Sequence, residues 1–438
     1  MWRASGSSSL AATAAIAATA FAVGGAAARR YLSATAHHRV GASVALARRC
    51  PAKAGDTLES VETPCLVVDL DAMEKNLVAL PRSLREIAPQ VAIRPHAKAH
   101  KCAEIGRLQL HYSEAVGLCC QKVAEAEAMF AGGVRDLLLS NEIYGASRYE
   151  RMAELVKQGA AVTLIFDHAE TIRQADAVAA AHGVEFGALV DVNVGQNRCG
   201  VDSVDDAVAL AQQLQASQYL QLLGIQAYHG SAQHIRSYTE KAKVIDTVAA
   251  KAKKVRDAFV KQGLKCDVVT GGGTGTYLLE AQSGVFTEVQ PGSYLFNDAD
   301  YARNLGVDGE KVRQWEQSLF VLTTVMSTNH GANPPRSVVD AGMKAVSLDS
   351  GAPLVYSSID ASALPQLEYQ GGGDEHGILV PAAGDKSKSE IPMPALGKKL
   401  LLTPGHCDPT TNLYDFVVGF RNGTVEHVWE VAARGPGN

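Results

Sequence analysis

The sequence predicts an α/β fold in which a (β/α)8 barrel is followed by an antiparallel β domain. Between residues 91 and 295, short β-rich runs alternate with longer, alanine-rich stretches of helical character. This alternation is typical of βα units and a parallel sheet. From Leu319 onward, β-branched runs are separated by turn residues and convincing helices are missing. A chain of 438 residues has room for both domains.

The first 55 residues differ from the rest of the chain. They contain seven lysines and arginines and no acidic residue, and Ser, Ala and Arg dominate them. Such a composition is typical of an organelle transit peptide, and ARRYLS (28–33) resembles a mitochondrial processing site with cleavage near Tyr31. We expect residues 1–55 to be a transit peptide for the mitochondrion or the chloroplast. The apolar run 10–28 leaves a secretory signal or a membrane anchor as alternatives.

The barrel is expected over residues 56–318. Its strands are predicted at Val91–Arg94, Val116–Cys119, Asp136–Ser140, Thr163–Phe166, Phe186–Val192, Leu222–Tyr228, Cys266–Thr270 and Glu288–Leu295. Helices are predicted at Lys122–Ala131, Ser147–Gln158, Ala169–His182, Asp205–Ala216 and Tyr238–Lys261. Eight such units over about 230 residues fit a (β/α)8 barrel. Thr63–Leu80 is predicted to be a strand and a helix that join the two domains.

The β domain is expected over residues 319–438. Its β-branched segments include FVLTTVMSTN, RSVVDAGMKAVSL, KKLLLTP and YDFVVGFRNGTVEHVWEVAARG. Residues 366–390, which contain GGGDEHG and GDKSKSE, are interpreted as an exposed loop. We expect an antiparallel sheet, because turn residues rather than helices separate these segments.

Composition narrows the class of protein. Hydrophobic residues make up 47% of the chain and charged residues 20%, which is ordinary for a globular protein. The net charge of −5 is mixed along the chain, so no nucleic-acid partner is expected. The eight cysteines show no CxxC motif and no disulfide-framework spacing, which favours reduced thiols in an intracellular compartment. The mature chain is not expected to enter a membrane.

Polar and glycine-rich clusters follow the predicted strands at their C-terminal ends. They include PHAK, CCQK, SNE, DVNVGQNRCG, YHGSAQH, GGGTGT and PGSYLFND. A (β/α)8 barrel builds its active site from the loops at that face. The distribution of these clusters therefore supports a barrel and places its site.

The stretch VAIRPHAKAHK (91–101) ends a short apolar run in two lysines, two histidines and an arginine. A lysine at the barrel mouth would be partly desolvated and close to other cations, here Lys101 and Arg94. Both effects lower the pKa of an amine and make it a carbonyl nucleophile. A solvated basic loop is the alternative on this segment alone.

The segment VVTGGGTGTYLL (268–279) has the residues of an anion cradle. Its glycines follow a predicted strand, and Thr274, Gly275 and Thr276 lead into a short helix. Backbone N–H groups and threonine hydroxyls are donors for phosphate oxygens. The pattern is neither GxGxxG nor a Walker motif, so a dinucleotide or a triphosphate is not indicated. Phosphate sites in barrels tend to follow strands seven and eight.

Two further groups point to chemistry. Arg198, in VDVNVGQNRCGV, is placed at the mouth, where it would hold a phenolate or a carboxylate, or else form a surface salt bridge. His406 and Asp408 are two residues apart, so in an extended segment they share one side, away from Cys407. A nitrogen and an oxygen ligand favour manganese, magnesium or a similar hard ion.

These segments together, in this order, resemble the fold-type III pyridoxal-phosphate (PLP) enzymes, which are alanine-racemase-like in architecture. The resemblance covers 57–433 and is carried by TPCLVVDLDAMEKN, RPHAKAHK, NRCG, GGGTGT and PGSYLFND. Within that class the chain is similar to the group of D-threonine aldolases and D-serine dehydratases. It implies that Lys98 binds PLP covalently. Homodimers are also implied by this resemblance.

Further site residues follow from the resemblance. Arg198 would contact the phenolic oxygen of PLP, as the arginine of the racemases' NRLG does, and Gln121 is a weaker candidate for the same edge. The phosphate would be cradled by Gly273, Thr274, Gly275 and Thr276. Two tyrosines, Tyr228 and Tyr294, would line the pocket.

The metal pair distinguishes the members of the group. The dehydratases resemble one another in a His-x-Cys pair that binds zinc, whereas the aldolases have His-x-Asp and a harder ion. Because this chain has Asp408, the resemblance implies a PLP- and metal-dependent D-threonine aldolase that cleaves β-hydroxy-D-amino acids to glycine and an aldehyde. His234 is the candidate base for the hydroxyl proton. The alternatives are a D-serine dehydratase, which gives pyruvate and ammonia, and a non-catalytic PLP-binding protein.

Overall fold

The computed structural model describes residues 49–360, 362, 364–382 and 393–437. Residues 1–48 of the expected transit peptide lie outside them. The folded unit begins at Cys50 rather than near Asp56. Ala52 packs in a core cluster, and the Gly55 N–H donates to the Val425 carbonyl at 2.9 Å. Residues 50–55 therefore belong to the folded unit.

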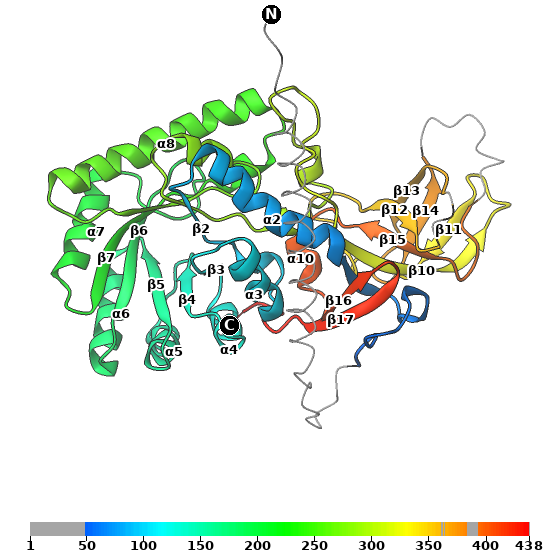
Figure 1. Ribbon diagram of the computed structural model, residues 1–438, viewed down its shortest axis with the longest axis horizontal. Helices are drawn as coiled ribbons and strands as arrows, with labels where there is room; N and C mark the ends of the chain where they lie inside the picture. Colours follow the sequence, from blue (N-terminus) through cyan, green and yellow to red (C-terminus); the bar gives the residue numbers. More distant parts are fainter. Residues whose placement is uncertain (1–48, 361, 363, 383–392, 438) are drawn as a thin grey trace, which may run out of the picture. The chain divides into compact units, whose positions relative to one another are not determined.

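Eight parallel strands form the barrel, in chain order around the ring; β2 to β7 are labelled in Figure 1. They are β2 (Ala92–Ile93), β3 (Leu118–Cys120), β4 (Asp136–Leu139), β5 (Ala161–Phe166), β6 (Phe186–Asp191), β7 (Leu220–Gln226), β8 (Val268–Gly271) and β9 (Glu288–Val289). β9 pairs with both β8 and β2. A parallel bridge between His96 and Cys119 joins β2 to β3 and closes the ring. The predicted barrel is confirmed.

Helices connect successive strands and cover the outside of the barrel. They are α3 (Ala103–Tyr112), α4 (Val123–Ala131), α5 (Ala146–Lys157), α6 (Ala169–His182), α7 (Val204–Ala216), α8 (Tyr238–Lys261) and α9 (Tyr277–Gln282). Five of these seven agree with the predicted helices to within a residue or so. The prediction did not place α3, because this segment directly follows the basic cluster and carries a polar mixture of residues.

The last barrel strand is shorter than predicted. Only Glu288–Val289 is a strand, and Ser293–Leu295 forms a 3-10 helix, η4. Pro291 lies between them and has no N–H to donate to a neighbouring strand. The chain therefore leaves the sheet at this proline and enters the loop above the barrel.

Alternating side chains on the barrel strands pack in opposite directions. Cys119, Leu138, Ile165 and Leu189 form one cluster, which draws in partly buried residues of β7 and β8. Their neighbours Leu118, Leu137, Leu139 and Leu164 belong instead to the large cluster shared with the helices. This alternation is the period of two that strands impose. It gives the barrel a filled interior and an apolar outer surface under the helices.

A second, nine-stranded sheet contains β10 (Leu319–Asn329), β11 (Arg336–Val339), β12 (Leu354–Ser358), β13 (Leu367–Gly371), β14 (Gly377–Pro381), β15 (Lys399–Thr403), β16 (Phe416–Arg421) and β17 (Thr424–Glu430). Its ninth strand is β1 (Cys65–Asp69), which precedes the barrel in the chain. The order is β13-β14-β11-β10-β1-β16-β17, with β15 pairing β10 and β12. Helix α2 (Leu70–Ile87) leads from β1 to the barrel.

Two features of this sheet differ from the expectation. The sheet is mixed, because β1 pairs parallel to β16 and antiparallel to β10. Part of the expected loop 366–390 is a hairpin of β13 and β14, paired from Leu367–Pro381 to Gly371–Gly377. Tyr369 anchors it, since the ring is buried and its hydroxyl donates to the Ala341 carbonyl at 2.8 Å. The glycine-rich segment between the two strands resembles an exposed loop, so the sequence did not predict this hairpin.

The second sheet delivers one short helix to the barrel mouth. After β15, helix α10 (Cys407–Thr411) packs against the 3-10 helix η2 (Ala97–Ala99) at the end of β2. Lys101 fixes this junction, because its Nζ donates to Asn412 Oδ1 at 2.7 Å and to the Gly435 carbonyl at 3.1 Å. Two segments more than 300 residues apart in the chain thereby meet.

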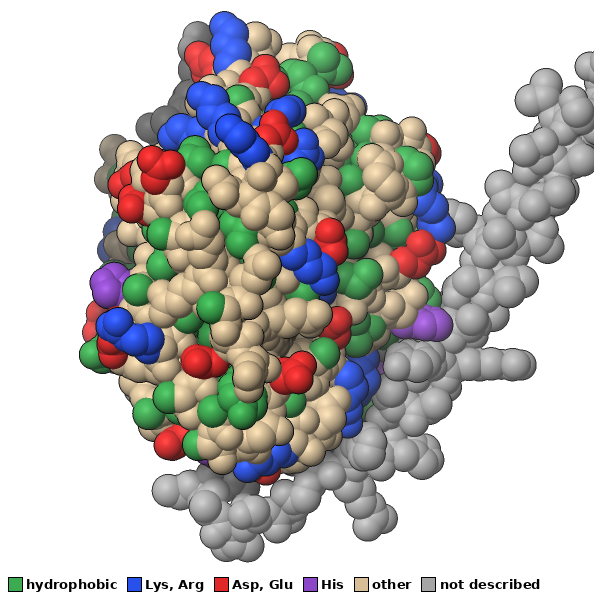
Figure 2. Space-filling view, turned by 90° about the vertical axis from the view of Figure 1, so that its left-hand side faces the viewer, with side chains coloured by type: hydrophobic (Ala, Val, Ile, Leu, Met, Phe, Trp, Pro, Cys, Tyr) green, Lys and Arg blue, Asp and Glu red, His purple; other side chains and the backbone are tan. Residues whose placement is uncertain are grey.

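The surface carries interspersed charges. On the face shown in Figure 2, Lys and Arg side chains alternate with Asp and Glu and leave no field of one sign. Among the described residues, no helix is both long enough and apolar enough to cross a membrane.

Candidate active site

A cavity of about 350 Å³ lies at the C-terminal ends of the barrel strands. It is lined by His96, Lys98, Gln196, Arg198, Tyr228, Gly230, Ser231, Gln233, His234, Gly273, Thr274, Gln290, Gly292, Ser293, Tyr301, His406 and Asp408. Loops that follow β2, β6, β7, β8 and β9 contribute, together with the start of α10. The cavity thus collects eight of the twelve residues expected at the site.

Four of the five basic residues of VAIRPHAKAHK are engaged by other side chains. Arg94 donates to Asp136 and Glu288 at 2.6 and 2.8 Å. His96 bonds Gln121 Oε1 at 3.1 Å, His100 bonds Gln109 Oε1 at 3.0 Å, and Lys101 holds the junction described above. Burial lowers the pKa of His96 to about 3 and of His100 to about 4, so both imidazoles are neutral. The cluster is therefore neither a solvated loop nor a set of free cations.

Lys98 is the fifth, and its ammonium faces the cavity. Its Nζ lies 3.8 Å from Asp408 Oδ2, and the Lys98 side chain is 35% exposed. Burial lowers its pKa, but Tyr228 and the Asp408 carboxylate outweigh burial and raise the pKa above its usual value. The expected lowering by Lys101 and Arg94 is wrong, because both of those cations are neutralised by their own carboxylates.

Only part of the glycine-rich loop faces the cavity; its other residues bond to the protein behind it. Gly273 and Thr274 line the cavity. The Gly275 N–H instead donates to Gln233 Oε1 at 2.8 Å, and the Thr276 hydroxyl donates to Glu280 Oε1 at 2.8 Å. Within the described residues, the N–H groups of Gly273 and Thr274 have no acceptor. The donors that face the cavity are therefore fewer than the four residues expected.

The other expected PLP contacts fall into two groups. Arg198 and Tyr228 line the cavity, and no carboxylate of the described chain pairs with Arg198. Gln121 lies behind His96 rather than in the cavity. Tyr294 is fully buried, and its hydroxyl bonds Ser113 at 3.0 Å and Gln109 at 3.2 Å. The expectation that Tyr294 lines the pocket does not agree with this placement; its backbone N–H instead holds Thr274 Oγ1 at 2.9 Å.

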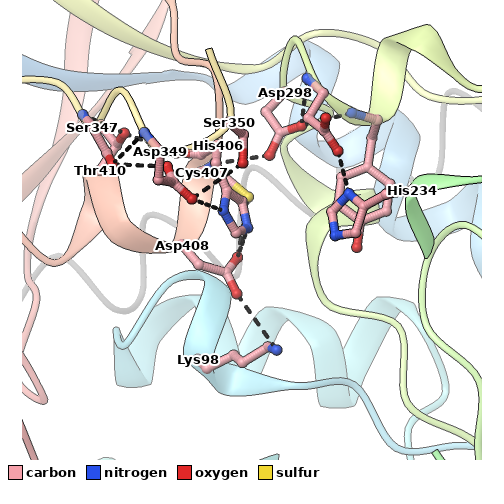
Figure 3. A network of polar contacts seen from close by, with 12 residues as sticks. Lys98, His234, Asp298, Ser347, Asp349, Ser350, His406, Cys407, Asp408 and Thr410 are labelled. Carbon is pink, nitrogen blue, oxygen red and sulfur yellow. Dashed lines mark hydrogen bonds and ion pairs between the residues drawn. The ribbon is translucent and has the colours of Figure 1, made fainter. Parts of the chain in front are cut away.

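His406 and Asp408 converge opposite Lys98 (Figure 3). His406 Nε2 lies 3.9 Å from Asp408 Oδ1. The local conformation differs from the expected strand, because His406 is the extended residue before α10 and Asp408 is the second residue of that helix. Cys407 is fully buried and does not line the cavity. The turn from extended chain into helix, rather than a period of two, brings the two side chains together.

Carboxylates surround this histidine. Asp349 Oδ2 lies 3.1 Å from His406 Nδ1 and leaves Nε2 facing Asp408. Burial lowers the pKa of His406, but Asp408, Asp298 and Asp349 outweigh it and raise the pKa. Burial raises the pKa of Asp408, but Lys98 and His406 hold it below its usual value. An imidazole that donates one ring N–H to a carboxylate is the arrangement found around metal-binding histidines.

His234 enters the cavity from the loop after β7, in the 3-10 helix η3 (Gly230–His234). Its Nδ1 bonds Asp300 Oδ2 at 2.5 Å, and its side chain is 43% exposed. Four residues that support the site were not predicted: Gln233, Asp298, Asp300 and Asp349. Asp298 and Asp300 stand in the predicted PGSYLFND cluster and its continuation, which is the one signal that pointed to them.

The residues present fit both groups that the resemblance implies. Lys98 presents an amine in a cavity that also holds Arg198 and the two free N–H groups of the glycine-rich loop, which suits an aldehyde cofactor that carries a phosphate and a phenolic oxygen. His406 Nε2 and the Asp408 carboxylate form a nitrogen and oxygen pair, which suits a hard divalent ion. Both sets share one cavity.

Comparisons with known proteins agree with this arrangement. Residues 68–300 match the family model of the alanine racemase N-terminal domain, and residues 318–420 match that of the putative serine dehydratase domain. The 3-hydroxy-D-aspartate aldolase of Paracoccus denitrificans (strain Pd 1222) is 41% identical over 391 residues, which cover 88% of this chain and 96% of that protein. The D-threonine aldolase of Arthrobacter sp is 41% identical over 387 residues, with the same two coverages.

The fold is matched equally well. The crystal structure of D-threonine aldolase from Filomicrobium marinum has a TM-score of 0.80 and 39% identity, and the match covers 88% of this chain and 99% of that one. The fold of both domains and the sequence identity thus agree in placing the chain among the aldolases for β-hydroxy-D-amino acids. The chain belongs to the alanine racemase N-terminal domain family and, within the fold-type III PLP enzymes, to the group of D-threonine aldolase and 3-hydroxy-D-aspartate aldolase.

Proposed function

We propose that this protein is an aldolase that cleaves β-hydroxy-D-amino acids to glycine and an aldehyde, with PLP and a divalent metal ion. The observation that carries the proposal is the position of the His406–Asp408 pair in the same cavity as Lys98 and His234, with Asp408 Oδ2 3.8 Å from Lys98 Nζ. A carbon–carbon lyase for such substrates needs an amine-binding centre, a group that acts on the β-hydroxyl, and a base. The relatives at 41% identity are aldolases for substrates of this class.

Lys98 would hold PLP covalently, with Arg198 at its phenolic oxygen, Tyr228 beside it and the N–H groups of Gly273 and Thr274 at its phosphate. When bound, PLP supplies an electron sink for the pair released at Cα. The neutral His96 behind Lys98 adds no second charge to this end of the cavity. The chain itself orients the substrate and excludes competing charges.

His406 and Asp408 would bind the metal ion, and manganese or magnesium suits them better than zinc, because the pair has no thiolate. Such an ion lowers the pKa of a hydroxyl or a water that it binds. The Asp349 carboxylate at Nδ1 keeps Nε2 of His406 directed toward this position. The β-hydroxyl of the substrate would thus lie between this pair and His234.

His234 would accept the β-hydroxyl proton. Its Nδ1 is taken by Asp300, so Nε2 is the nitrogen available to the substrate. Loss of the hydroxyl proton allows the oxygen to form the aldehyde carbonyl as the Cα–Cβ bond breaks. A base placed at the hydroxyl rather than at Cα favours this cleavage over removal of the Cα proton.

A D-serine dehydratase is the second candidate, and the match of residues 318–420 to the putative serine dehydratase domain favours it. The same cavity would serve that reaction if the Cβ–O bond broke and the β-hydroxyl left as hydroxide. We prefer the aldolase because Asp408 gives an oxygen ligand where the resemblance assigns a cysteine to the dehydratases. A non-catalytic PLP-binding protein is disfavoured, because it has no use for His406 and Asp408.

The test uses the full-length chain with PLP and manganese. We expect acetaldehyde and glycine from D-threonine, with loss of activity after chelation and recovery after manganese is added back. D-serine is run in parallel for pyruvate and ammonia. His406→Ala should abolish aldehyde formation, whereas His376→Ala, an exposed histidine of the same sheet region, should not. Pyruvate as the dominant product would replace the aldolase by the dehydratase.

The proposed enzyme is further expected to be a homodimer in the mitochondrion or chloroplast. The first expectation rests on the resemblance and the second on the composition of residues 1–55. Sedimentation equilibrium of the PLP-loaded protein tests the first, and a monomer at micromolar concentration would refute it. Microscopy of a fusion with residues 1–55 tests the second, and diffuse cytoplasmic signal would refute it.

A further inference from the structure

Asp300 is a buried carboxylate that binds three cationic or potentially cationic side chains. His234 Nδ1 lies 2.5 Å from its Oδ2, and the guanidinium groups of Arg236 and Arg303 both donate to its Oδ1. Its side chain is 4% exposed. In contrast, His234 itself reaches the cavity and, among the described residues, its Nε2 has no partner.

Asp300 is held in place by a second buried aspartate. Oδ1 of Asp298 accepts the N–H groups of Asp300 and Tyr301 at 3.1 and 2.9 Å. Its Oδ2 accepts the Cys407 N–H at 2.8 Å. One carboxylate therefore fixes the segment that carries Asp300 against the segment that carries His406 and Asp408. Asp300 and the His234 ring that it holds therefore keep a fixed position relative to His406 and Asp408 across the cavity.

The charge on Asp300 is retained in the folded protein. Burial raises its pKa, but the hydrogen bonds from Arg236 and His234 outweigh burial and hold the pKa below its usual value. A carboxylate so stabilised is a poor base, because the same contacts that keep it ionised reduce its affinity for a proton. It is well suited to accept the N–H of a neighbouring imidazole.

We propose that Asp300 is a positioning residue that holds His234 as the Nδ1–H tautomer, so that Nε2 faces the cavity as the base. This inference rests on the proposed function. The substrate O–H bond breaks as the Nε2–H bond forms, and the oxygen pair becomes the carbonyl π bond while the Cα–Cβ bond breaks. The bonding pair stays with Cα, which takes up one proton and becomes glycine. The imidazolium formed at His234 is stabilised by Asp300 and later returns its proton.

The competing view is that Asp300 only anchors Arg236 and Arg303. The two views differ for substitutions around the carboxylate. Asp300→Asn keeps the size and one acceptor oxygen, but its amide can donate to Nδ1 and select the wrong tautomer. Arg303 is half exposed and donates both to Asp300 and to the Ser350 carbonyl, the latter at 3.0 Å. Arg303→Gln therefore removes one anchored cation but leaves the contact between Asp300 and His234 in place. It is the matched control.

The experiment measures kcat and KM for D-threonine with the PLP- and manganese-loaded full chain. For Asp300→Asn we expect kcat to fall on the order of 10²–10⁴-fold, in the range known for loss of a histidine-orienting carboxylate, with KM changed less than about threefold. Asp300→Glu, which keeps the charge but moves the carboxylate, should lose at least about tenfold. Arg303→Gln should stay within about twofold. Equal losses in Asp300→Asn and Arg303→Gln would overturn the proposal.

A second readout does not depend on turnover. Histidine labelled with 15N, with the His234 signal identified by its absence in His234→Gln, reports which ring nitrogen carries the proton. We expect Nδ1–H in the wild type and its loss in Asp300→Asn; an unchanged tautomer in that variant would overturn the proposal. This readout stands even if Asp300→Asn folds poorly, because Asp300→Glu can be compared in the same way.

The outcomes separate this inference from the proposed function. If His234→Gln is inactive and Asp300→Asn is fully active, the role of Asp300 is wrong and the aldolase stands. If His234→Gln keeps wild-type activity, His234 is not the base and the role of Asp300 falls with it. If the wild type yields no aldehyde from D-threonine, the proposed function fails, and the tautomer measurement alone decides whether Asp300 orients His234.

Discussion

Gly273 leaves no room for a side chain between the glycine-rich loop and Gln233. A Cβ atom on Gly273 would lie 2.7 Å from Gln233 Oε1 and 2.8 Å from its Cδ. Gln233 is 1% exposed and holds the loop by accepting the Gly275 N–H and by donating to Thr276 Oγ1, both at 2.8 Å. Gly273→Ala therefore forces this side chain away from the loop, and both hydrogen bonds are weakened.

The size of the effect follows from these two bonds. A buried hydrogen bond contributes about 1 kcal/mol net, and a buried donor left unpaired costs about 1–3 kcal/mol. Because both bonds are weakened rather than fully broken, the combined cost is about 2–4 kcal/mol. If half of this falls on the loop geometry that is proposed to hold PLP, the dissociation constant for PLP rises roughly tenfold, because 1.4 kcal/mol corresponds to a factor of ten. We expect a rise of roughly 5–30-fold and a lower thermal midpoint.

The assay titrates the apoenzyme with PLP and follows the absorbance of the bound cofactor. Gly331→Ala is the matched control, because no atom lies within 4 Å of the Cβ it would add. Gln233→Ala removes the same two bonds by another route, so the double variant should be little worse than either single one. An unchanged PLP affinity in Gly273→Ala, or fully additive effects, would refute the reasoning.

Three other substitutions test the surroundings of the site. Burial raises the pKa of Glu280 from 4.5 to about 7, so the folded state is penalised increasingly as pH rises through that range. Glu280→Gln should therefore raise the free energy of unfolding more at pH 8 than at pH 5, by up to about 3 kcal/mol; an equal gain at both pH values in calorimetry would contradict this. Asp408→Cys should weaken manganese binding at least about tenfold and favour zinc, since a thiolate prefers the softer ion; isothermal titration with each metal decides. Arg94→Ala leaves the buried Glu288 unpaired and should destabilise the protein by about 3–5 kcal/mol, whereas a thermal midpoint like that of the wild type would mean that Glu288 takes up a proton at little cost.

Much of the fold was readable from the sequence because the barrel is built from local patterns. Each of the eight strands is a short apolar run between polar loops, and the helices between them have their own period, so strand order and the face of the site followed from the chain alone. The second sheet was predicted less well. Its strand β1 lies some 250 residues from β10 and some 350 residues from β16, the strands it pairs with. The parallel pairing to β16 leaves no signature in either segment.

The candidate site divides in the same way. Lys98, Arg198, Thr274, His406 and Asp408 stand in motifs whose residue types already indicate their chemistry, and the structure brings all five to one cavity. Tyr294 shows the limit of such motifs, because an aromatic residue beside a glycine-rich loop can face the pocket or the packing behind it. Its burial against Gln109 and Ser113 is decided by contacts with α3.

The sequence by itself determined the α/β class, the end of the barrel where the cavity lies, and the residue types from which an aldehyde-cofactor site and a hard-ion site are proposed. These properties depend on residue type and on spacing within a few positions. Tertiary structure alone decided that Lys101 and Arg94 are neutralised and that Asp298 ties His406 to the loop of Asp300. The protonation and orientation of a side chain depend on charges and acceptors that arrive from distant parts of the chain, and a pattern within one segment carries no record of them.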